Sequence, residues 1–314
     1  SKAEPLYLRA LSIREKALEP EHPHTAISLN NLAALYHNQG LYSKAEPLYL
    51  RALSIREKAL GPEHPDTVTS LNSLALLYDD QGLYSKAEPL FLRALAIAEK
   101  VLGSEHPDTA TSLNYLALVY HNQGLYSKAE PLYKRALAIR DNALGEDHPD
   151  TATSLNNLAI VYRSQALYSK AEPLYLRALA VREKALGPEN LDIASSLNEL
   201  ALLYSDQGLY SKAESLHTRA LAIVEKALGP EHPNTAHALN NLGEIYRLQG
   251  NYQKAQQFHT RALLVRERIL GREHPSVANS LNNLGLVYAS QGKYVKSEPL
   301  YLRALEIYEK ALGP

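Results

Sequence analysis

The sequence contains no cysteine, methionine or tryptophan, and only two phenylalanines among its 314 residues. Without cysteine, disulfides, thiol nucleophiles and thiolate metal sites are excluded. No apolar run approaches the ~18 residues that suggest a membrane span, and the first residues lack the apolar segment of a signal peptide. Leucine and tyrosine supply the bulky side chains, and so narrow an alphabet indicates one motif copied many times.

The charge balance is close to neutral. The formal net charge is −1, with 45% hydrophobic and 21% charged residues, which is ordinary for a folded protein. Nucleic-acid binding generally needs a clustered positive surface that displaces counterions. The composition therefore argues against a nucleic-acid partner and against disorder.

A repeat of 42 residues runs through the whole chain without insertion or deletion. His-Pro pairs recur at this spacing, at His22, His64, His106, His148, His232 and His274. In the one doubled gap the register holds, but Asn190-Leu191 stands in place of His-Pro. We therefore expect one array over 1–314, with no linker and no second domain.

Two helices are legible in each repeat, and we call them helix A and helix B. Helix A begins at the proline, whose fixed φ suits the first helical position, and Gly82 ends it in the second unit. Helix B begins near Tyr84 and ends at Gly103. The short connection between them makes the pair antiparallel, and stacked neighbours bury the apolar faces.

This reading gives a lone helix B followed by seven A–B pairs. The lone helix spans 1–18. The pairs span about 23–60, 65–102, 107–144, 149–186, 191–228, 233–270 and 275–312.

The motif L-x-x-L-A-x-x-Y-x-x-Q-G-x-Y-x-K-A-E-P-L-Y-x-R-A-L resembles a tetratricopeptide repeat. The longer form, with H-P-D-T-A-x-S-L-N-N-L-A and E-K-A-L-G-P-E, is similar to the repeats of kinesin light chains and their bacterial relatives. The resemblance implies an all-α fold, a right-handed α-solenoid of antiparallel helix pairs. It also implies a cytoplasmic protein that binds protein or peptide ligands in a concave groove lined by the A helices.

The resemblance places the asparagine of the L-N-x-L motif in that groove, where its amide can bracket the backbone of an extended peptide. Alternatively, each asparagine bonds a neighbouring helix and only ties the array together. The series is Asn30, Asn72, Asn114, Asn156, Asn198, Asn240 and Asn282.

A second groove position varies between otherwise copied units. It reads His37, Asp79, His121, Arg163, Ser205, Arg247 and Ala289. The variation is explained either by tailored recognition or by neutral drift. Kinesin light chains are expected to prefer acidic peptides through basic groove residues. Because Asp79, Asp80 and Asp206 are acidic here, this chain departs from that pattern.

Neither a metal site, a cofactor nor a catalytic centre is expected. Successive His-Pro copies are a whole helix pair apart and cannot converge on one ion, so we expect each histidine to bond locally at its helix start. No G-x-S-x-G or Gly-rich phosphate loop is present. The carboxylates occupy first turns, Ala-Glu-Pro and Glu-Lys segments, which are positions for helix dipoles and surface pairs.

Two features of the array are irregular. Ala166 replaces the turn glycine, which strains the chain if that site needs positive φ. The first helix displays Leu6, Tyr7, Ala10 and Leu11 without a preceding helix A. We therefore expect either that the chain is a fragment of a longer array or that its ends associate head to tail.

Three functions agree with these observations. The leading one is a protein-interaction scaffold that binds extended peptide segments. The others are a structural, self-assembling rod and the sensor array of a larger signalling protein. No enzymatic activity and no membrane partner are expected.

Overall fold

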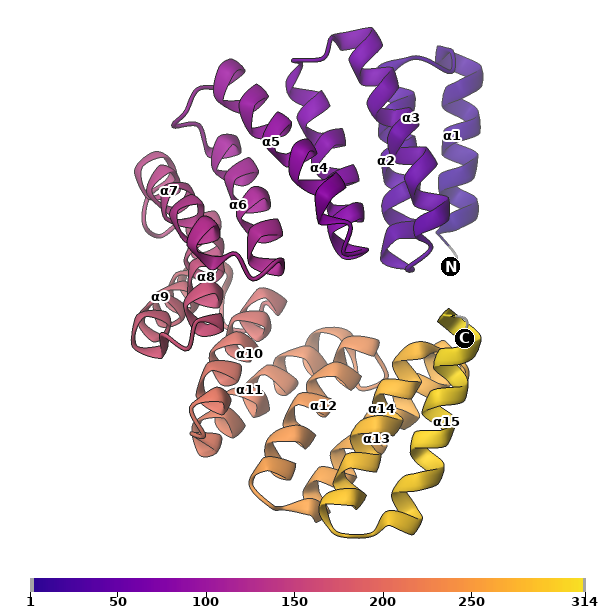
Figure 1. Cartoon of the computed structure of the whole chain (residues 1–314), viewed down its shortest axis with the longest axis vertical. Coiled ribbons are helices and arrows are strands. Elements are labelled where there is room, and N and C mark those ends of the chain that lie inside the picture. The colour runs from indigo at the N-terminus through magenta and orange to yellow at the C-terminus, as the bar shows by residue number, and fades with distance from the viewer. Residues whose placement is uncertain (1–2, 313–314) are drawn as a thin grey trace. The chain divides into compact units, whose positions relative to one another are not determined.

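A computed structural model of the chain describes residues 3–312, and every regular element in this part is an α-helix (Figure 1). The all-α solenoid of antiparallel helix pairs is therefore confirmed. The helices are α1 (Glu4–Leu18), α2 (Pro23–Asn38), α3 (Tyr42–Leu60), α4 (Pro65–Asp80), α5 (Tyr84–Val101), α6 (Pro107–Asn122), α7 (Tyr126–Leu144), α8 (Pro149–Ser164), α9 (Tyr168–Leu186), α10 (Leu191–Asp206), α11 (Tyr210–Leu228), α12 (Pro233–Leu248), α13 (Tyr252–Leu270), α14 (Pro275–Ser290) and α15 (Tyr294–Leu312). Even numbers are A helices, and odd numbers are B helices.

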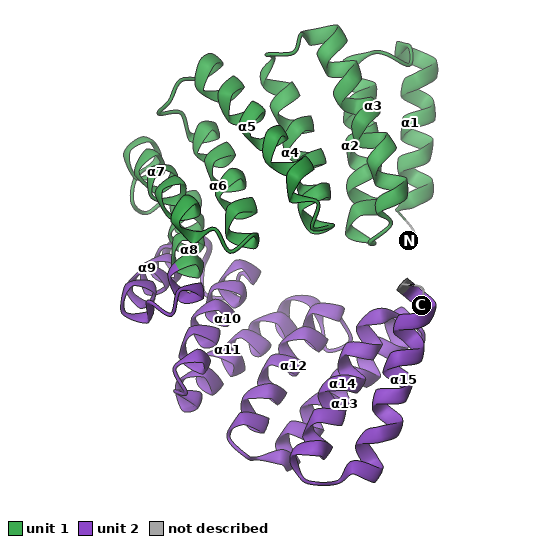
Figure 2. Ribbon diagram, in the orientation of Figure 1, with its two compact units in different colours: residues 1–161 green, residues 162–314 purple. Residues whose placement is uncertain are grey.

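The chain divides into two compact units, residues 1–161 and 162–314, with the division inside α8 (Figure 2). Within each unit, a helix A packs on the helix B that follows it and on the helix B that precedes it, as α6 does with α7 and α5 and as α12 does with α13 and α11. We describe each unit by itself, and the single array over 1–314 stays a prediction. Across the described residues, no helix has the length and apolar character needed to cross a bilayer.

Small and large apolar residues alternate in the core between A and B helices. In the second repeat, Ala75 and Ala87 let α4 and α5 approach closely, while Leu71 and Phe91 fill the space around them, all with no measurable exposure. The same positions are buried in the second unit, for example Leu239 and Ala255. Burial of this repeated stripe against both neighbours stabilises each pair.

Each helix A starts at a local side-chain cap. The Nδ1 of His64 accepts from the backbone N–H of Asp66 at 3.1 Å, which satisfies one of the free donors of the first turn. Where histidine is replaced, the Asn190 Oδ1 accepts from the N–H of Asp192 at 2.8 Å. The local role of these histidines is therefore confirmed. Among the described residues, no three His, Asp or Glu side chains lie where they could hold one metal ion.

Polar pairs connect successive repeats. The Tyr78 hydroxyl donates to Glu46 Oε1 at 2.7 Å, and Arg93 Nη1 lies 2.6 Å from Glu57 Oε1. Both pairs recur along the chain. The glutamate of the Ala-Glu-Pro segment therefore accepts a hydrogen bond from a tyrosine of the next helix A. Its position in the sequence did not reveal this role.

The turn after helix A needs a left-handed residue. Gly82 has φ 71°, and Ala166 has φ 57° at the equivalent place in the fourth repeat. The positive φ expected at Ala166 is confirmed. A side chain in this region costs about 1 kcal/mol.

We therefore expect Ala166→Gly to raise the free energy of unfolding by about 1 kcal/mol. Ala96→Gly is a matched control, because Ala96 is an exposed residue inside α5, where the same change costs about 1 kcal/mol. Urea denaturation of both variants measures the two effects. If both substitutions destabilise, positive φ at Ala166 carries no strain.

Candidate functional site: the inner face of the A helices

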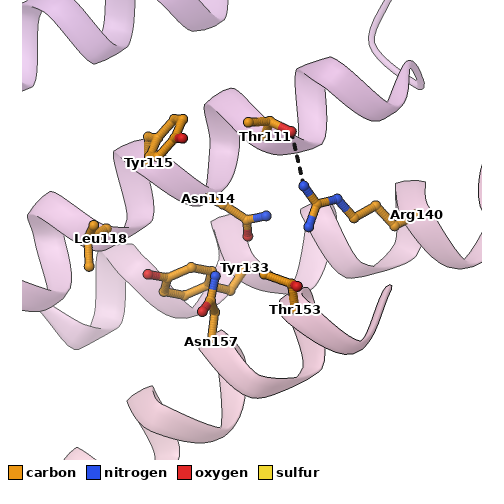
Figure 3. Close-up of a pocket in the computed structure, with 8 residues that line it drawn as sticks. All are labelled: Thr111, Asn114, Tyr115, Leu118, Tyr133, Arg140, Thr153 and Asn157. Atoms are coloured by element: carbon orange, nitrogen blue, oxygen red, sulfur yellow. Dashed lines mark hydrogen bonds between the residues drawn. The ribbon is translucent and has the colours of Figure 1, made fainter. Parts of the chain in front are cut away.

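A buried arginine links neighbouring repeats. Arg140 of α7 is 7% exposed, and its Nη1 donates to the Asp150 carbonyl at 2.9 Å and to Ser154 Oγ at 3.1 Å, both on α8. Its Nη2 donates to Thr111 Oγ1 of α6 at 3.0 Å (Figure 3). Burial lowers the pKa of this guanidinium, while Asp150 favours its charge. The side chain thus bridges the A helices of two repeats.

The contacts with the following helix A recur from repeat to repeat. Arg56 donates to the Asp66 carbonyl at 2.8 Å and to Ser70 Oγ at 2.9 Å, and Arg266 makes the same pair of contacts with Ser276 and Ser280. Arg14 and Arg182 donate to the corresponding serines.

Sequence reasoning missed this ladder. The sequence does contain a sign of this pairing, because an arginine precedes a serine by 14 residues in five repeats. In another repeat both residues are replaced together, the arginine by Val224 and the serine by Ala238.

The asparagines of the L-N-x-L motif lie beside these arginines. Asn72, Asn114 and Asn240 are 7–8% exposed, and the other four are half-buried. Asn114 Nδ2 lies 3.4 Å from Ser154 Oγ of the next helix A, and Asn198 Oδ1 lies 2.9 Å from His217 Nδ1. When the Asn240 amide is oriented to donate to His259, its oxygen accepts from Arg266 Nη1 at 2.7 Å.

Several of these amides keep an oxygen without a partner. The Oδ1 atoms of Asn30, Asn72, Asn114 and Asn156 are buried and receive no hydrogen bond. Asn72, Asn114 and Asn198 each line a surface hollow. The amides thus contact both the packing and the hollows, and the binding role of the seven asparagines, Asn282 included, stays a prediction.

The variable position pairs with the next repeat. His37 Nε2 lies 2.6 Å from Asp80 Oδ2, Asp79 Oδ2 accepts from Asn122 Nδ2 at 2.7 Å, and Arg163 Nε lies 3.5 Å from Asp206 Oδ2. In each pair the partners are 43 residues apart. Burial raises the pKa of the Asp79 carboxyl, and the Asn122 bond opposes this shift.

Two further residues of this position contact their own helix. The Nδ1 of His121 lies 3.4 Å from Asn122 Oδ1, and Arg247 donates two hydrogen bonds to Glu244. For the three cross-repeat pairs, complementarity between neighbouring repeats accounts for the variation without a ligand. Recognition by these five positions therefore stays a prediction.

A hollow of about 180 Å³ opens between α6, α7 and α8 (Figure 3). Its apolar wall is formed by Tyr115, Leu118 and Tyr133, and Tyr115 stacks on Phe91 with ring centroids 5.9 Å apart. Asn114 points toward Tyr133 from α6, and Asn157 points toward it from α8.

The hollow therefore combines an apolar surface with two side-chain amides, one from α6 and one from α8. Tyr133 is 3% exposed, and burial raises the pKa of its hydroxyl, so it stays neutral at physiological pH. Such a hollow can accept one apolar side chain, while the amides donate to and accept from a peptide backbone.

Comparison with known proteins identifies the repeat. The model of the tetratricopeptide repeat matches residues 1–58, 28–100, 80–142, 108–184, 192–263 and 238–310. The chain belongs to the tetratricopeptide repeat family. Arrays of this kind typically act as non-catalytic protein-interaction scaffolds. No curated protein sequence matches the chain significantly.

Solved structures place the repeats among kinesin-light-chain-like ones. The chain is similar to BtubC (BKLC) from P. vanneervenii, at 26% identity and a TM-score of 0.60, over 74% of this chain and 91% of that one. It is also similar to the nearly identical repeats of a putative kinesin light chain from Podospora anserina, at 30% identity and a TM-score of 0.56, over 66% and 98%. A tetratricopeptide sensor protein from Pyrococcus horikoshii shares the fold at 20% identity and a TM-score of 0.63, over 97% of this chain and 44% of that one.

Proposed function

We propose that this tetratricopeptide repeat protein binds extended peptide segments of partner proteins on the inner face of its A helices. The observation that carries the proposal is the hollow lined by Tyr115, Leu118 and Tyr133, with Asn114 and Asn157 on either side. An extended peptide presents alternate side chains and a free backbone, which match an apolar hollow and flanking amides.

On this proposal, the protein binds its partners in the cytoplasm without catalysing a reaction. Its partners are proteins, not nucleic acid or membranes. The net charge of −1 supports the exclusion of nucleic acid. The expected partner contributes at least one apolar side chain to the hollow.

The double variant Tyr115→Glu/Leu118→Glu is expected to lower the affinity for selected peptides at least about tenfold, because it places two carboxylates in the apolar hollow. The repeat tolerates these residues, since Glu199 and Glu244 occupy the same two positions in other units. Peptides selected from a random library on the wild type supply the ligands, and calorimetry measures binding.

Leu92→Lys is the control for this experiment. Leu92 is 45% exposed on α5, and Lys134 occupies its position in the next repeat. The control is expected to bind like the wild type. Equal binding by the double variant would contradict the proposal.

Self-association is the second candidate. Ile13 and Tyr7 of α1 are 56% and 37% exposed, whereas the equivalent Ile55 and Tyr49 are 0% and 3% exposed. This apolar face favours contact with a second copy. A monomeric mass by light scattering at high protein concentration excludes it.

A further inference from the structure

Three B helices lack the buried arginine. Its position is occupied by Ala98 in α5, Val224 in α11 and Tyr308 in α15, and it is arginine at Arg56, Arg140 and Arg266. At Ala98 the missing side chain leaves a hollow of about 220 Å³ between α4, α5 and α6. The acceptors that serve the arginine elsewhere remain in place around it.

Four such acceptor groups line the Ala98 hollow. They belong to Thr69 and Asn72 of α4 and to Asp108 and Ser112 of α6. For each of the four, a counterpart in at least one other repeat accepts from a guanidinium.

The counterparts supply the geometry. Thr111, which matches Thr69, accepts from Arg140 at 3.0 Å. The carbonyl of Asp150 and the hydroxyl of Ser154, which match Asp108 and Ser112, accept from the same arginine at 2.9 and 3.1 Å.

The fourth acceptor is the buried amide oxygen of Asn72. Asn72 is 8% exposed, and its Oδ1 receives no hydrogen bond. The matching oxygen of Asn240 accepts from both Nη atoms of Arg266, at 2.7 and 3.2 Å, when the amide also donates to His259. The same oxygen also lacks a partner at Asn114, beside the resident Arg140. What distinguishes the Ala98 hollow is therefore the vacancy of the arginine position together with its full acceptor set.

Charge favours a cation at this place. The Asp108 carboxylate is 75% exposed at the hollow, 3.7 Å from His106 Nδ1. No basic side chain lines the hollow among its described residues.

The Val224 position offers an internal contrast. Its hollow of about 390 Å³ is larger. However, Ala238 replaces the serine, and the Oδ1 of Asn198 already lies 2.9 Å from His217 Nδ1. Of the four acceptors, one is therefore absent and one already has a hydrogen bond. A guanidinium would form fewer hydrogen bonds there and would bind more weakly.

We propose that the Ala98 hollow is a receptor for an arginine side chain of the bound peptide, which takes the place of the arginine that this repeat lacks. The inference rests on the proposed peptide-binding function and names one residue type of the partner. Arginine fits better than lysine because the acceptors are spread over two helices, and the planar guanidinium fork carries five donors that can reach both.

The test uses the blocked amino acid N-acetyl-arginine-N-methylamide as the probe, with the full chain. We expect NMR shifts at Thr69, Asn72 and Ser112 that saturate in the millimolar range. The neutral citrulline analogue and the lysine analogue are expected to bind at least about tenfold more weakly, because each lacks part of the charge or fork.

Two variants complete the design. Ala98→Arg restores the side chain found at five equivalent positions, so we expect it to fold and to abolish the shifts. Ser112→Ala is expected to weaken the probe about fivefold, because one acceptor is lost. Saturation at the same residues in Ala98→Arg, equal binding of the citrulline analogue, or no shift at about 10 mM probe would overturn the inference.

The two proposals fail in different ways. If library peptides bind the Tyr115 hollow but the probe ignores the Ala98 hollow, only the arginine receptor is wrong. If the probe binds while no library peptide depends on Tyr115 and Leu118, the peptide site is wrong and the receptor stands as a separate site.

Discussion

Lowering the pH from about 7 to about 4 is expected to destabilise residues 162–314 before residues 3–161. The cause is two buried histidines, His217 of α11 and His259 of α13, which are 2% and 0% exposed. They replace the buried tyrosines found at Tyr49, Tyr133 and Tyr175. No described histidine of the first unit is buried.

Burial lowers the pKa of both histidines to about 4, from 6.5 in the unfolded chain. The Nε2 of His259 has no hydrogen-bond partner, so a proton on this atom would have no acceptor. The nearby Glu244 favours protonation of the ring, whereas Arg247 and Arg266 disfavour it. His237 lies near His217 and also disfavours its protonation. The folded state therefore keeps both rings neutral.

The sign of the pH dependence follows from this difference. Above pH 6.5 both states are neutral, and these groups add no pH dependence. Between pH 6.5 and about 4 only the unfolded chain gains the protons, so the free energy of unfolding falls as the pH falls. The expected loss is about 2–3 kcal/mol per histidine.

Hydrogen exchange at several pH values measures the effect for each unit. We expect faster exchange in α11 to α14 at low pH, after correction for the intrinsic rate. The variant His217→Tyr/His259→Tyr supplies the control, because tyrosine already fits this position in other repeats, and it should remove the dependence in this window. Equal acid sensitivity of the double variant would show that other groups cause it.

The second large effect concerns the buried arginines. Arg140→Ala is expected to lower the free energy of unfolding by about 3 kcal/mol, because three acceptors lose their hydrogen bond from the guanidinium and a hollow opens beneath them. The acceptors are the Asp150 carbonyl, Ser154 and Thr111.

Arg135→Ala is the matched control in the same helix. Arg135 Nη1 lies 2.7 Å from Glu99, but the two side chains are 40% and 36% exposed, so solvent screens the pair. We expect a loss below about 1 kcal/mol. Urea denaturation compares the two variants, and a double-mutant cycle with Ser154→Ala isolates the buried contact. Similar losses for Arg140 and Arg135 would refute the bridging role of the buried side chain.

Much of the fold could be predicted from the sequence because its signals are local. Pro65 and His64 mark the start of α4, because proline suits the first helical position and the histidine caps a free N–H. Gly82 marks the end of the helix, because it accepts positive φ. Because the sequence repeats every 42 residues, the same helix boundaries are then expected in the other repeats.

The candidate site was harder to predict, because its contacts join residues of different repeats. The period places Asn72 and Asp79 on one side of α4, but it does not reveal that Asp79 receives Asn122 of the next repeat. The recurring spacing of 14 residues between arginine and serine links the two residues, but it does not show that Arg140 is buried while Arg135 stays partly exposed. Such choices depend on the rotation of neighbouring helices, which a repeat spacing does not specify.

Photo-cross-linking tests the central claim most directly. Tyr115 on the inner face, or Leu92 as the control on α5, is replaced by the photoreactive residue benzoylphenylalanine, and a library-selected peptide is added before irradiation. We predict a cross-link from position 115 and none from position 92. Cross-linking from position 92 alone, or equally from both, would contradict a peptide site on the inner face of the A helices.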